Sequence, residues 1–413
     1  MEKYFVAAMS GAQWLGNGSI LRLLEYFGNN AQRAWHASIT ELKKARLTQR
    51  TIESFVAFRK KNPDAPERLA DYCDRKHFGL CSYVDEDYPP LLKEISSPPV
   101  FFYYRGKLQP FVERVGIVGT RNNTDYGKKV ALEFAEQLAA VGLTVVSGAA
   151  RGIDTFAHRG ALKTGRTVAV LGYGLNWVFP SENKKLLEEI AENGLVMSEF
   201  HPNVKATALT FPQRNRIIAG LCRSVVVVEA GKKSGALITA ELALENNRDV
   251  FCVPGKLDST TSSGCNDWIH EGATLVRNVK DVLDHCRFDS EKISVQNLPE
   301  TNLFEQSLFA QKNLPKQILF ERMLSEKSFS VRKPPEQKNL SAPKKLSVPK
   351  TPPVALDGLN AKIFEIIPAD GFVTDDDILN KIDDVEPYEL PQILLELELK
   401  NCIVENAGRY TRK

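Results

Sequence analysis

The sequence predicts an α/β protein built on a doubly wound, mostly parallel sheet. Between residues 86 and 286, short runs of β-branched and other apolar residues alternate with amphipathic helical segments such as 126–141 and 153–164. The runs are apolar throughout, as in strands that helices cover on both faces. They are 115–119, 144–147, 167–171, 195–198, 224–229 and 249–253.

Residues 1–85 predict a small helical module. Apolar residues recur at helical spacing from Ile20 to Phe27 and stop at a Gly-Asn-Asn breaker. A second helix is expected after Ser38, which forms a capping box with Glu41, and a third over 49–61. Short helices around tight turns favour a helix-hairpin-helix or SAM-like module, which can grip a DNA backbone. A plain packing domain fits the same pattern.

The last third of the chain predicts a linker and a second small domain. Residues 330–353 hold six prolines and six basic residues against one acid, which predicts a disordered Pro/Lys-rich linker over 287–355. Beyond it, helices are expected over 359–367, 375–382 and 388–401, followed by a hairpin near the end of the chain. Three helices and a hairpin are the order of a winged-helix domain, here 356–413.

Composition narrows the class of protein. The net charge is only +3, so any affinity for nucleic acid depends on local clusters of cations. No apolar run reaches the ~18–20 residues of a membrane span, and the first residues do not resemble a signal peptide, so we expect a cytoplasmic protein with no membrane contact. Seven scattered cysteines without a C-x-x-C pair predict reduced thiols and no metal site.

Glycine-rich segments follow four of the expected strands. They are 119–121, 147–154, 172–175 and 234–239. Carboxyl ends of parallel strands meet at one edge of the sheet, where helix N-termini offer free N–H donors. Arginines 121, 151, 214 and 216 lie in or near these segments. The sequence therefore predicts a phosphate-binding crest, although tight strand-to-helix turns without a ligand also use glycine.

Catalytic patterns are weak, so no catalytic residue and no cofactor are assigned. Asp154 and His158 share a helix face, but a helix cap and a buried hydrogen bond are the favoured roles. Glu199 and Glu229 fit a salt-bridge network with the nearby arginines equally well. Neither a dinucleotide fingerprint nor a Walker sequence occurs.

Six motifs in order resemble one bacterial family. They are Gly-Ile-Val-Gly-Thr-Arg (116–121), Ser-Gly-Ala-Ala-Arg-Gly-Ile-Asp-x-x-Ala-His (147–158), Val-Leu-Gly-Tyr-Gly-Leu (170–175), Phe-Pro-Gln-Arg-Asn-Arg-Ile-Ile-Ala-Gly-Leu (211–221), Ser-Gly-Ala-Leu-Ile-Thr-Ala (234–240) and Val-Pro-Gly (253–255). From about residue 21 to 276 the chain thus resembles the DNA-processing protein A (DprA/Smf) family.

The resemblance implies an extended Rossmann-type fold, cooperative binding of single-stranded DNA, a homodimer through the Rossmann domain, and loading of the RecA recombinase during natural transformation. Arg121 matches an arginine at the mouth of the DNA pocket, and Phe211 an aromatic beside the strand path. Some members carry a lysine after the proline of the third loop, where this chain has Ser181 and only later Lys184 and Lys185. The predicted DNA-binding set is Gly119, Thr120, Arg121, Ser147, Gly148, Arg151, Gly172, Gly174, Lys184, Lys185, Phe211, Arg214, Asn215, Arg216, Ser234 and Gly235.

Two functions other than DNA binding are also compatible with the sequence, and so are two roles for the segment 252–269. The fold also resembles nucleoside-monophosphate phosphoribohydrolases, but residues 230–236 lack their double glycine after proline, although Glu241 falls in plausible register. A pure interaction scaffold is the third reading. For the dimer, we expect the apolar segment 252–269 to supply a face, unless it only completes the cover of the sheet.

The acidic tail leads to a prediction of its own. Residues 356–413 contain 13 acidic residues against 6 basic ones, a surface that repels phosphate. We expect this module to bind a protein or the basic pocket of its own or a neighbouring Rossmann domain. The fragment 350–413 should therefore show no DNA binding at moderate salt, and deleting it should leave affinity for DNA equal or higher. Tight binding of duplex DNA by the fragment contradicts this.

Overall fold

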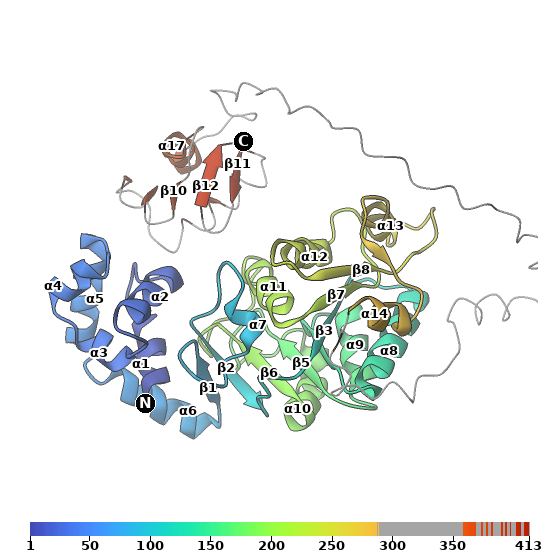
Figure 1. Ribbon diagram of the computed structural model, residues 1–413, viewed down its shortest axis with the longest axis horizontal. Coiled ribbons are helices and arrows are strands. Elements are labelled where there is room, and N and C mark those ends of the chain that lie inside the picture. Colours follow the sequence, from blue (N-terminus) through green and yellow to red (C-terminus); the bar gives the residue numbers. More distant parts are fainter. Residues whose placement is uncertain are drawn as a thin grey trace, which may run out of the picture.

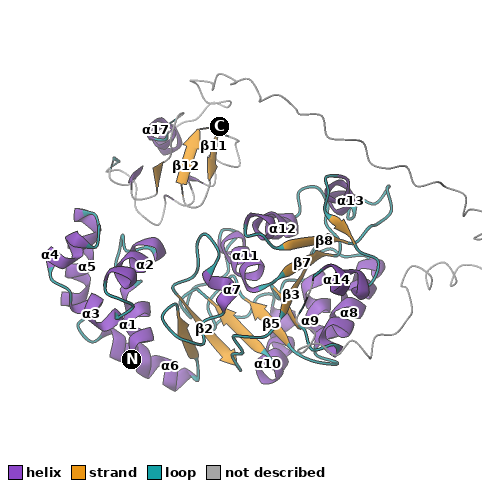
Figure 2. Ribbon diagram, in the orientation of Figure 1, coloured by secondary structure: helices purple, strands orange, loops and turns teal. Residues whose placement is uncertain are grey.

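The computed structural model describes residues 1–286, Phe288 and parts of 358–412, and is centred on a nine-stranded sheet (Figures 1 and 2). The strand order is β1-β2-β6-β5-β4-β3-β7-β8-β9. All neighbours from β6 to β9 are parallel, whereas β2 runs antiparallel to both β1 and β6. The strands are β1 (Gly79–Ser82), β2 (Phe101–Gly106), β3 (Arg114–Val118), β4 (Thr144–Ser147), β5 (Thr167–Val170), β6 (Leu195–Ser198), β7 (Ser224–Val227), β8 (Asp249–Cys252) and β9 (Thr274–Leu275).

Helices cover both faces of this sheet, because its strands are apolar on both sides. One face carries α8 (Asp125–Ala140), α9 (Ile153–Ala161), α10 (Lys184–Asn193) and α14 (Val279–His285). The other carries α7 (Pro90–Lys93), α11 (Thr210–Leu221), α12 (Gly235–Glu245) and α13 (Ser263–His270). From β3 the chain winds first toward β6 and then, through β7, toward β9. The predicted doubly wound, mostly parallel α/β fold is confirmed.

The six predicted strands are all present, within one or two residues of their expected bounds. Three further strands, β1, β2 and β9, lie at the two ends of the sheet. Because β1 pairs with β2 from Gly79 onward, the sheet begins inside the range 1–85 that was predicted as the helical module.

The N-terminal module is helical, as predicted. Its helices are α1 (Glu2–Met9), α2 (Asn17–Tyr26), α3 (Ala31–His36), α4 (Ile39–Lys44), α5 (Gln49–Lys61) and α6 (Ala65–Lys76). The capping box is confirmed: the Ser38 hydroxyl accepts from the Glu41 amide, and the Glu41 carboxylate accepts from the Ser38 amide at 2.9 Å. Gly28 ends α2 with a φ of +62°, a left-handed conformation that glycine adopts without strain.

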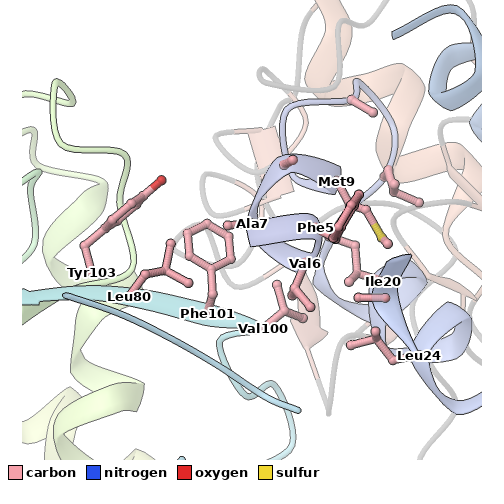
Figure 3. Packing of buried hydrophobic residues seen from close by; sticks show 14 of the residues in the cluster. Phe5, Val6, Ala7, Met9, Ile20, Leu24, Leu80, Val100, Phe101 and Tyr103 are labelled. Atoms are coloured by element: carbon pink, nitrogen blue, oxygen red, sulfur yellow. The ribbon is translucent and has the colours of Figure 1, made fainter. Parts of the chain in front are cut away.

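The N-terminal module and the sheet share one hydrophobic core. Figure 3 shows Val6 and Ala7 of α1 facing Val100 and Phe101 at the start of β2. Leu80 of β1 belongs to the same buried cluster. The antiparallel end of the sheet is therefore covered by the N-terminal helices, so this module packs as part of the sheet domain's cover.

The C-terminal part is described only in pieces. It contains α17 (Gly358–Ile366) and a three-stranded antiparallel sheet of order β10-β12-β11, made of β10 (Val373–Thr374), β11 (Ile403–Glu405) and β12 (Arg409–Arg412). The first predicted helix and the antiparallel pair of strands near the end of the chain are present, and the winged-helix domain stays a prediction. The helices expected over 375–382 and 388–401 lie mostly outside the described residues, as does the linker 287–355. Trp14 of the N-terminal module packs against the buried apolar residues of this part.

In the part of the chain that the structure describes, no helix is long and apolar enough to cross a bilayer.

Candidate nucleic-acid interface

The loops that follow β3, β4, β5 and β7 meet at one edge of the sheet. These four strands are parallel neighbours, in the order β5-β4-β3-β7, so their carboxyl ends lie side by side. The direction of winding reverses between β3 and β7, and open α/β sheets bind ligands at such a switch point. The predicted crest therefore exists as one continuous edge, which we call the crest loops (119–124, 148–152, 171–180 and 228–234).

An exposed arginine and an aromatic ring form the centre of the crest loops. Arg121 follows β3 and is exposed, and its guanidinium carbon lies 5.0 Å from the centroid of the Phe211 ring. Phe211 lies in the first turn of α11. No ion pair among the described residues involves Arg121, so its guanidinium donors stay free for an anion. A cation placed over an aromatic face offers one partner to a phosphate and one to a base.

A second aromatic ring continues this arrangement. The ring of Phe179 lies 5.8 Å from that of Phe211, tilted by 43°. Gly172 makes room for them, because a Cβ at this position would approach the Phe211 ring to 2.9 Å. A Cβ on Gly174 would collide with the backbone carbonyl of His201. These two predicted residues thus shape the crest by permitting close packing.

Arg214 lies beneath the crest, with 4% of its surface exposed. Its guanidinium donates to the carbonyl of Gly148, at the end of β4, at 2.6 Å and to that of Val170, at the end of β5. Burial lowers the pKa of Arg214, but an arginine keeps its proton over the whole physiological range. The structure thus corrects the predicted DNA contact, because these donors face backbone carbonyls and not solvent.

Asp154 and His158 complete the buried group around Arg214. The Asp154 carboxylate accepts from the amides of Gly148 and Ala150 at 3.2 and 3.3 Å, which fixes the loop before α9. His158 accepts from the Ala149 amide through Nε2, and its Nδ1 lies 2.7 Å from a threonine hydroxyl. The buried hydrogen bond expected for His158 is confirmed, but the helix cap expected from Asp154 is wrong: the N-cap of α9 is Gly152, and Asp154 binds amides of the loop before the helix. Both side chains are buried.

Ser147 and Gly148 are also enclosed, which corrects their predicted role as contacts. The Ser147 hydroxyl donates to the carbonyl of Ile117 at 2.6 Å and joins β4 to β3. A Cβ on Gly148 would collide with the Arg214 guanidinium, so glycine is needed there for packing. Gly119 is constrained in the same way by Ile153 and the Glu229 carbonyl.

Two of the predicted arginines form ion pairs. Arg216 pairs with Glu199, as the sequence allowed, and this pair is largely buried. Arg151 is exposed and forms a two-pronged pair with Glu182, at 2.5 and 2.9 Å. The pKa of Arg151 is raised by that hydrogen bond and charge. A phosphate that binds Arg151 must therefore compete with a carboxylate, whereas Arg121 is free.

The remaining predicted residues border the crest. Lys184 and Lys185 open α10 and are exposed, and Thr120 accepts from the Asn122 amide at 3.2 Å. Asn215 is buried and donates to the Gly235 carbonyl at 3.3 Å.

The N-terminus of α12 is open to solvent. Ser234 caps this helix, and a Cβ on Gly235 would meet nothing within 4 Å. Unlike Gly119 and Gly148, Gly235 therefore has space for a side chain, so close packing does not require a glycine there.

Two glutamates bear on an enzymatic function, Glu229 at a strand end and Glu241 for the phosphoribohydrolase reading, and of these Glu229 has a structural role. Glu229 has 1% of its surface exposed, and its carboxylate accepts from the Thr124 amide at 2.9 Å and the Thr124 hydroxyl at 2.6 Å. It thereby holds the start of α8 against β7. Glu241 lies exposed on α12. Among the described residues, no group of three or more His, Cys, Asp or Glu side chains could hold a metal ion.

Sequence reasoning missed Phe179, Trp177 and Lys205. Trp177 and Phe179 are exposed in the loop after β5, and Lys205 lies 4.9 Å from the Trp177 ring centroid. The available signal was the run Trp-Val-Phe before Pro180, three large apolar residues in a segment expected to be a loop.

The buried imidazole generates a prediction about acid. Burial, helped by the charge of Arg214, lowers the pKa of His158 from 6.5 to about 3. Below pH 6.5 only the unfolded chain takes up this proton, so the free energy of unfolding must fall as the pH falls. The loss due to this group at pH 5 is about 2 kcal/mol.

Urea unfolding at about pH 7.5 and pH 5 measures this loss. His158→Gln should show a smaller difference between the two pH values than the wild type, whatever its absolute stability. His270→Gln, at an exposed position, should keep the full difference. Equal acid sensitivity in the His158 variant and the wild type contradicts the assignment.

Comparison with known proteins gives the family. The family model described as DNA recombination-mediator protein A matches residues 79–287. The chain is 40% identical to Protein Smf of Synechocystis, over 68% of this chain and 72% of that protein. It is 39% identical to the DNA processing protein DprA of Streptococcus pneumoniae, over 66% of this chain and 95% of that protein.

A solved structure agrees with these relatives. The X-ray structure of DNA processing protein A from Streptococcus pneumoniae is 37% identical and superposes with a TM-score of 0.63, over 70% of this chain and 99% of that one. The resemblance carried by the six motifs is thereby confirmed. The chain belongs to the DNA recombination-mediator protein A family, also named DprA or Smf.

Proposed function

We propose that the protein binds single-stranded DNA along the crest loops and acts as a recombination mediator, without catalysing a reaction. The observation that carries this proposal is the exposed Arg121 stacked over Phe211 at the switch point of the sheet. A duplex hides the faces of its bases, whereas a single strand can place a base on an aromatic ring and a phosphate on the adjacent cation. The relatives named for DNA processing support the same ligand.

The crest suits binding more than chemistry. The titratable groups nearest to it, Asp154 and His158, are enclosed and hydrogen-bonded to backbone, and Glu229 is bound to Thr124. A nucleophile or a general base must reach the substrate, which these three groups do not. The exposed groups include the cation Arg121 and the ring of Phe179, which bind phosphates and bases, and the exposed carboxylate of Glu182 is paired with Arg151.

We further infer that the bound strand is handed to the RecA recombinase during natural transformation. The support is the family's description as a recombination mediator and the ordered motifs that place this chain within it. A mediator must hold the strand without burying it, so that a second protein can take it over. Crest loops that lie along one edge of the sheet, with Arg121 exposed, fit that requirement.

The central test is Arg121→Ala. Loss of a charged hydrogen-bond donor to phosphate should weaken binding to oligo-dT about tenfold or more. It should also flatten the log–log salt dependence by about 0.7, since each neutralised phosphate on a single strand contributes about that slope. Arg121→Lys should restore the slope. Lys163→Ala, which removes a cation at the opposite edge of the sheet, is the matched control and should leave both quantities unchanged.

Fluorescence anisotropy at several salt concentrations, on variants with wild-type circular dichroism, measures both quantities. Unchanged affinity and slope in folded Arg121→Ala would exclude the crest as the DNA site.

We also propose a homodimer through the Rossmann domain. Large apolar side chains are exposed near the β9 edge of the sheet: Ile238 and Leu244 on α12 and Leu275 on β9 itself. An uncovered edge strand and an apolar surface both favour association with a second copy. Within the predicted segment 252–269, Cys252 and Cys265 are buried, whereas Leu257 is 94% exposed.

Sedimentation equilibrium tests the surface. Leu244→Glu should shift the protein toward monomer, because association would bury an unpaired carboxylate. It should also reduce the cooperativity of DNA binding while the affinity of a single short oligonucleotide is kept. Leu257→Glu distinguishes the surface around Leu244 from the segment 252–269. If Leu257→Glu is monomeric while Leu244→Glu still associates, the contact between the two copies lies in the segment 252–269. A wild type that stays monomeric at high concentration contradicts the dimer.

A further inference from the structure

The loop after β5 exposes three consecutive large apolar residues beside the crest. Trp177, Val178 and Phe179 have 41%, 39% and 47% of their surfaces exposed. Such a cluster costs free energy in water unless a ligand or partner covers it. Phe179 is already joined to the Phe211–Arg121 group through its ring contact. Trp177, two residues earlier in the same crest loop, is not part of the Arg121–Phe211–Phe179 group.

Hydrogen bonds hold the exposed Trp177–Phe179 run in one conformation. The Trp177 indole N–H donates to the carbonyl of Asn203 at 2.9 Å, and its own amide donates to the carbonyl of Gly174 at 3.0 Å. Tyr173, which is buried, donates its hydroxyl to the carbonyl of Phe179 at 2.7 Å. Both ends of the Trp-Val-Phe run are therefore held by hydrogen bonds, which leaves the rings in place before any ligand arrives. Preorganised aromatic groups bind at a smaller entropic cost.

Trp177, like Phe211, has a cation close to its ring. The Lys205 ammonium lies 4.9 Å from the Trp177 ring centroid and is exposed. Lys184, Arg105 and Glu188 line a hollow together with Trp177 and Val178. With Lys205 at the ring, the cations outnumber this one carboxylate by three to one. An apolar ring in such surroundings favours a polyanion that carries flat apolar groups, which is the chemistry of an unpaired nucleic-acid strand.

We propose that Trp177 and Lys205 form a second stacking position for the same single strand, continuous with Arg121, Phe211 and Phe179. This inference rests on the proposed function, because it extends the crest. A strand that leaves Phe211 would pass over Phe179 and place a later base on the indole of Trp177, with a neighbouring phosphate near Lys205. The strand path thus runs from β3 toward the loop after β5, away from the β9 edge.

The first experiment uses the full chain and oligo-dT of increasing length, from about 5 to about 20 nucleotides, which spans common single-strand site sizes. Trp177→Ala should weaken the longer oligonucleotides roughly 5- to 150-fold, the range expected for one stacked base. The shortest should bind as to the wild type, because they reach only Arg121 and Phe211. Trp177→Phe keeps a ring and should retain most of the affinity. Phe111→Ala, which removes an even more exposed aromatic ring just before β3, is the control and should change nothing.

A second measurement reports on the ring directly. DNA-induced quenching of tryptophan fluorescence should largely disappear in Trp177→Phe, although this variant still binds. Lys205→Gln should lower the salt slope by about 0.7 for long strands only, and Lys205→Arg should restore it.

The outcomes separate this inference from the proposed function. If Arg121→Ala weakens every length while Trp177→Ala weakens none, the crest stands and the second stacking position is wrong. Wild-type behaviour of both variants overturns both proposals. If Trp177→Ala leaves DNA binding unchanged but alters self-association in sedimentation, the apolar run is a protein contact and the inference is likewise overturned.

Discussion

The buried guanidinium of Arg214 is the constraint on which the crest depends. A charge inside a protein is tolerated only where hydrogen bonds replace its lost water. Here the carbonyls of Gly148 and Val170 do so, and these groups end β4 and β5, so one side chain fixes two crest loops. Asp154 supplies opposite charge nearby, and burial keeps His158 neutral, which avoids a second positive charge. The carbonyls beneath the crest loops are thus already hydrogen-bonded to Arg214, so the exposed cations above them are not needed to hold the loops.

This arrangement divides the arginines of the crest into different roles. Arg214 acts on the backbone beneath, Arg216 is tied to Glu199, and Arg151 shares its charge with Glu182. Only Arg121 combines exposure with a ring beneath it and no carboxylate beside it. An exposed ion pair contributes little free energy, so the Arg151–Glu182 pair can open toward a phosphate at small cost. Among these four arginines, Arg121 therefore offers a permanent positive charge at the surface and Arg151 a conditional one.

Much of the fold could be predicted from the sequence, because buried parallel strands give short, continuous runs of β-branched residues that alternate with amphipathic helices. Strands β1 and β2 were missed, since Gly79–Ser82 contains no β-branched residue and β2 follows two prolines. The four crest loops were located correctly, but exposure within them was not. For Arg214 the information was present: it lies three, four and seven residues before Ile217, Ile218 and Leu221, on the helix face that packs on the sheet. Ser147 gave no such signal, because a hydroxyl suits either side of a strand end.

The N-terminal module helps to hold the crest loops in place. Its core is continuous with the sheet, and two polar contacts extend from it toward the crest loops. Asn176, beside Trp177, donates to the Tyr72 hydroxyl of α6 at 2.7 Å, and Asn17 of α2 donates to Glu199 at 3.1 Å. Glu199 in turn holds Arg216, so displacement of α2 would loosen a largely buried ion pair at the base of α11. The helical module need not touch DNA to affect binding, because it supports from behind the loops that we propose as the binding surface.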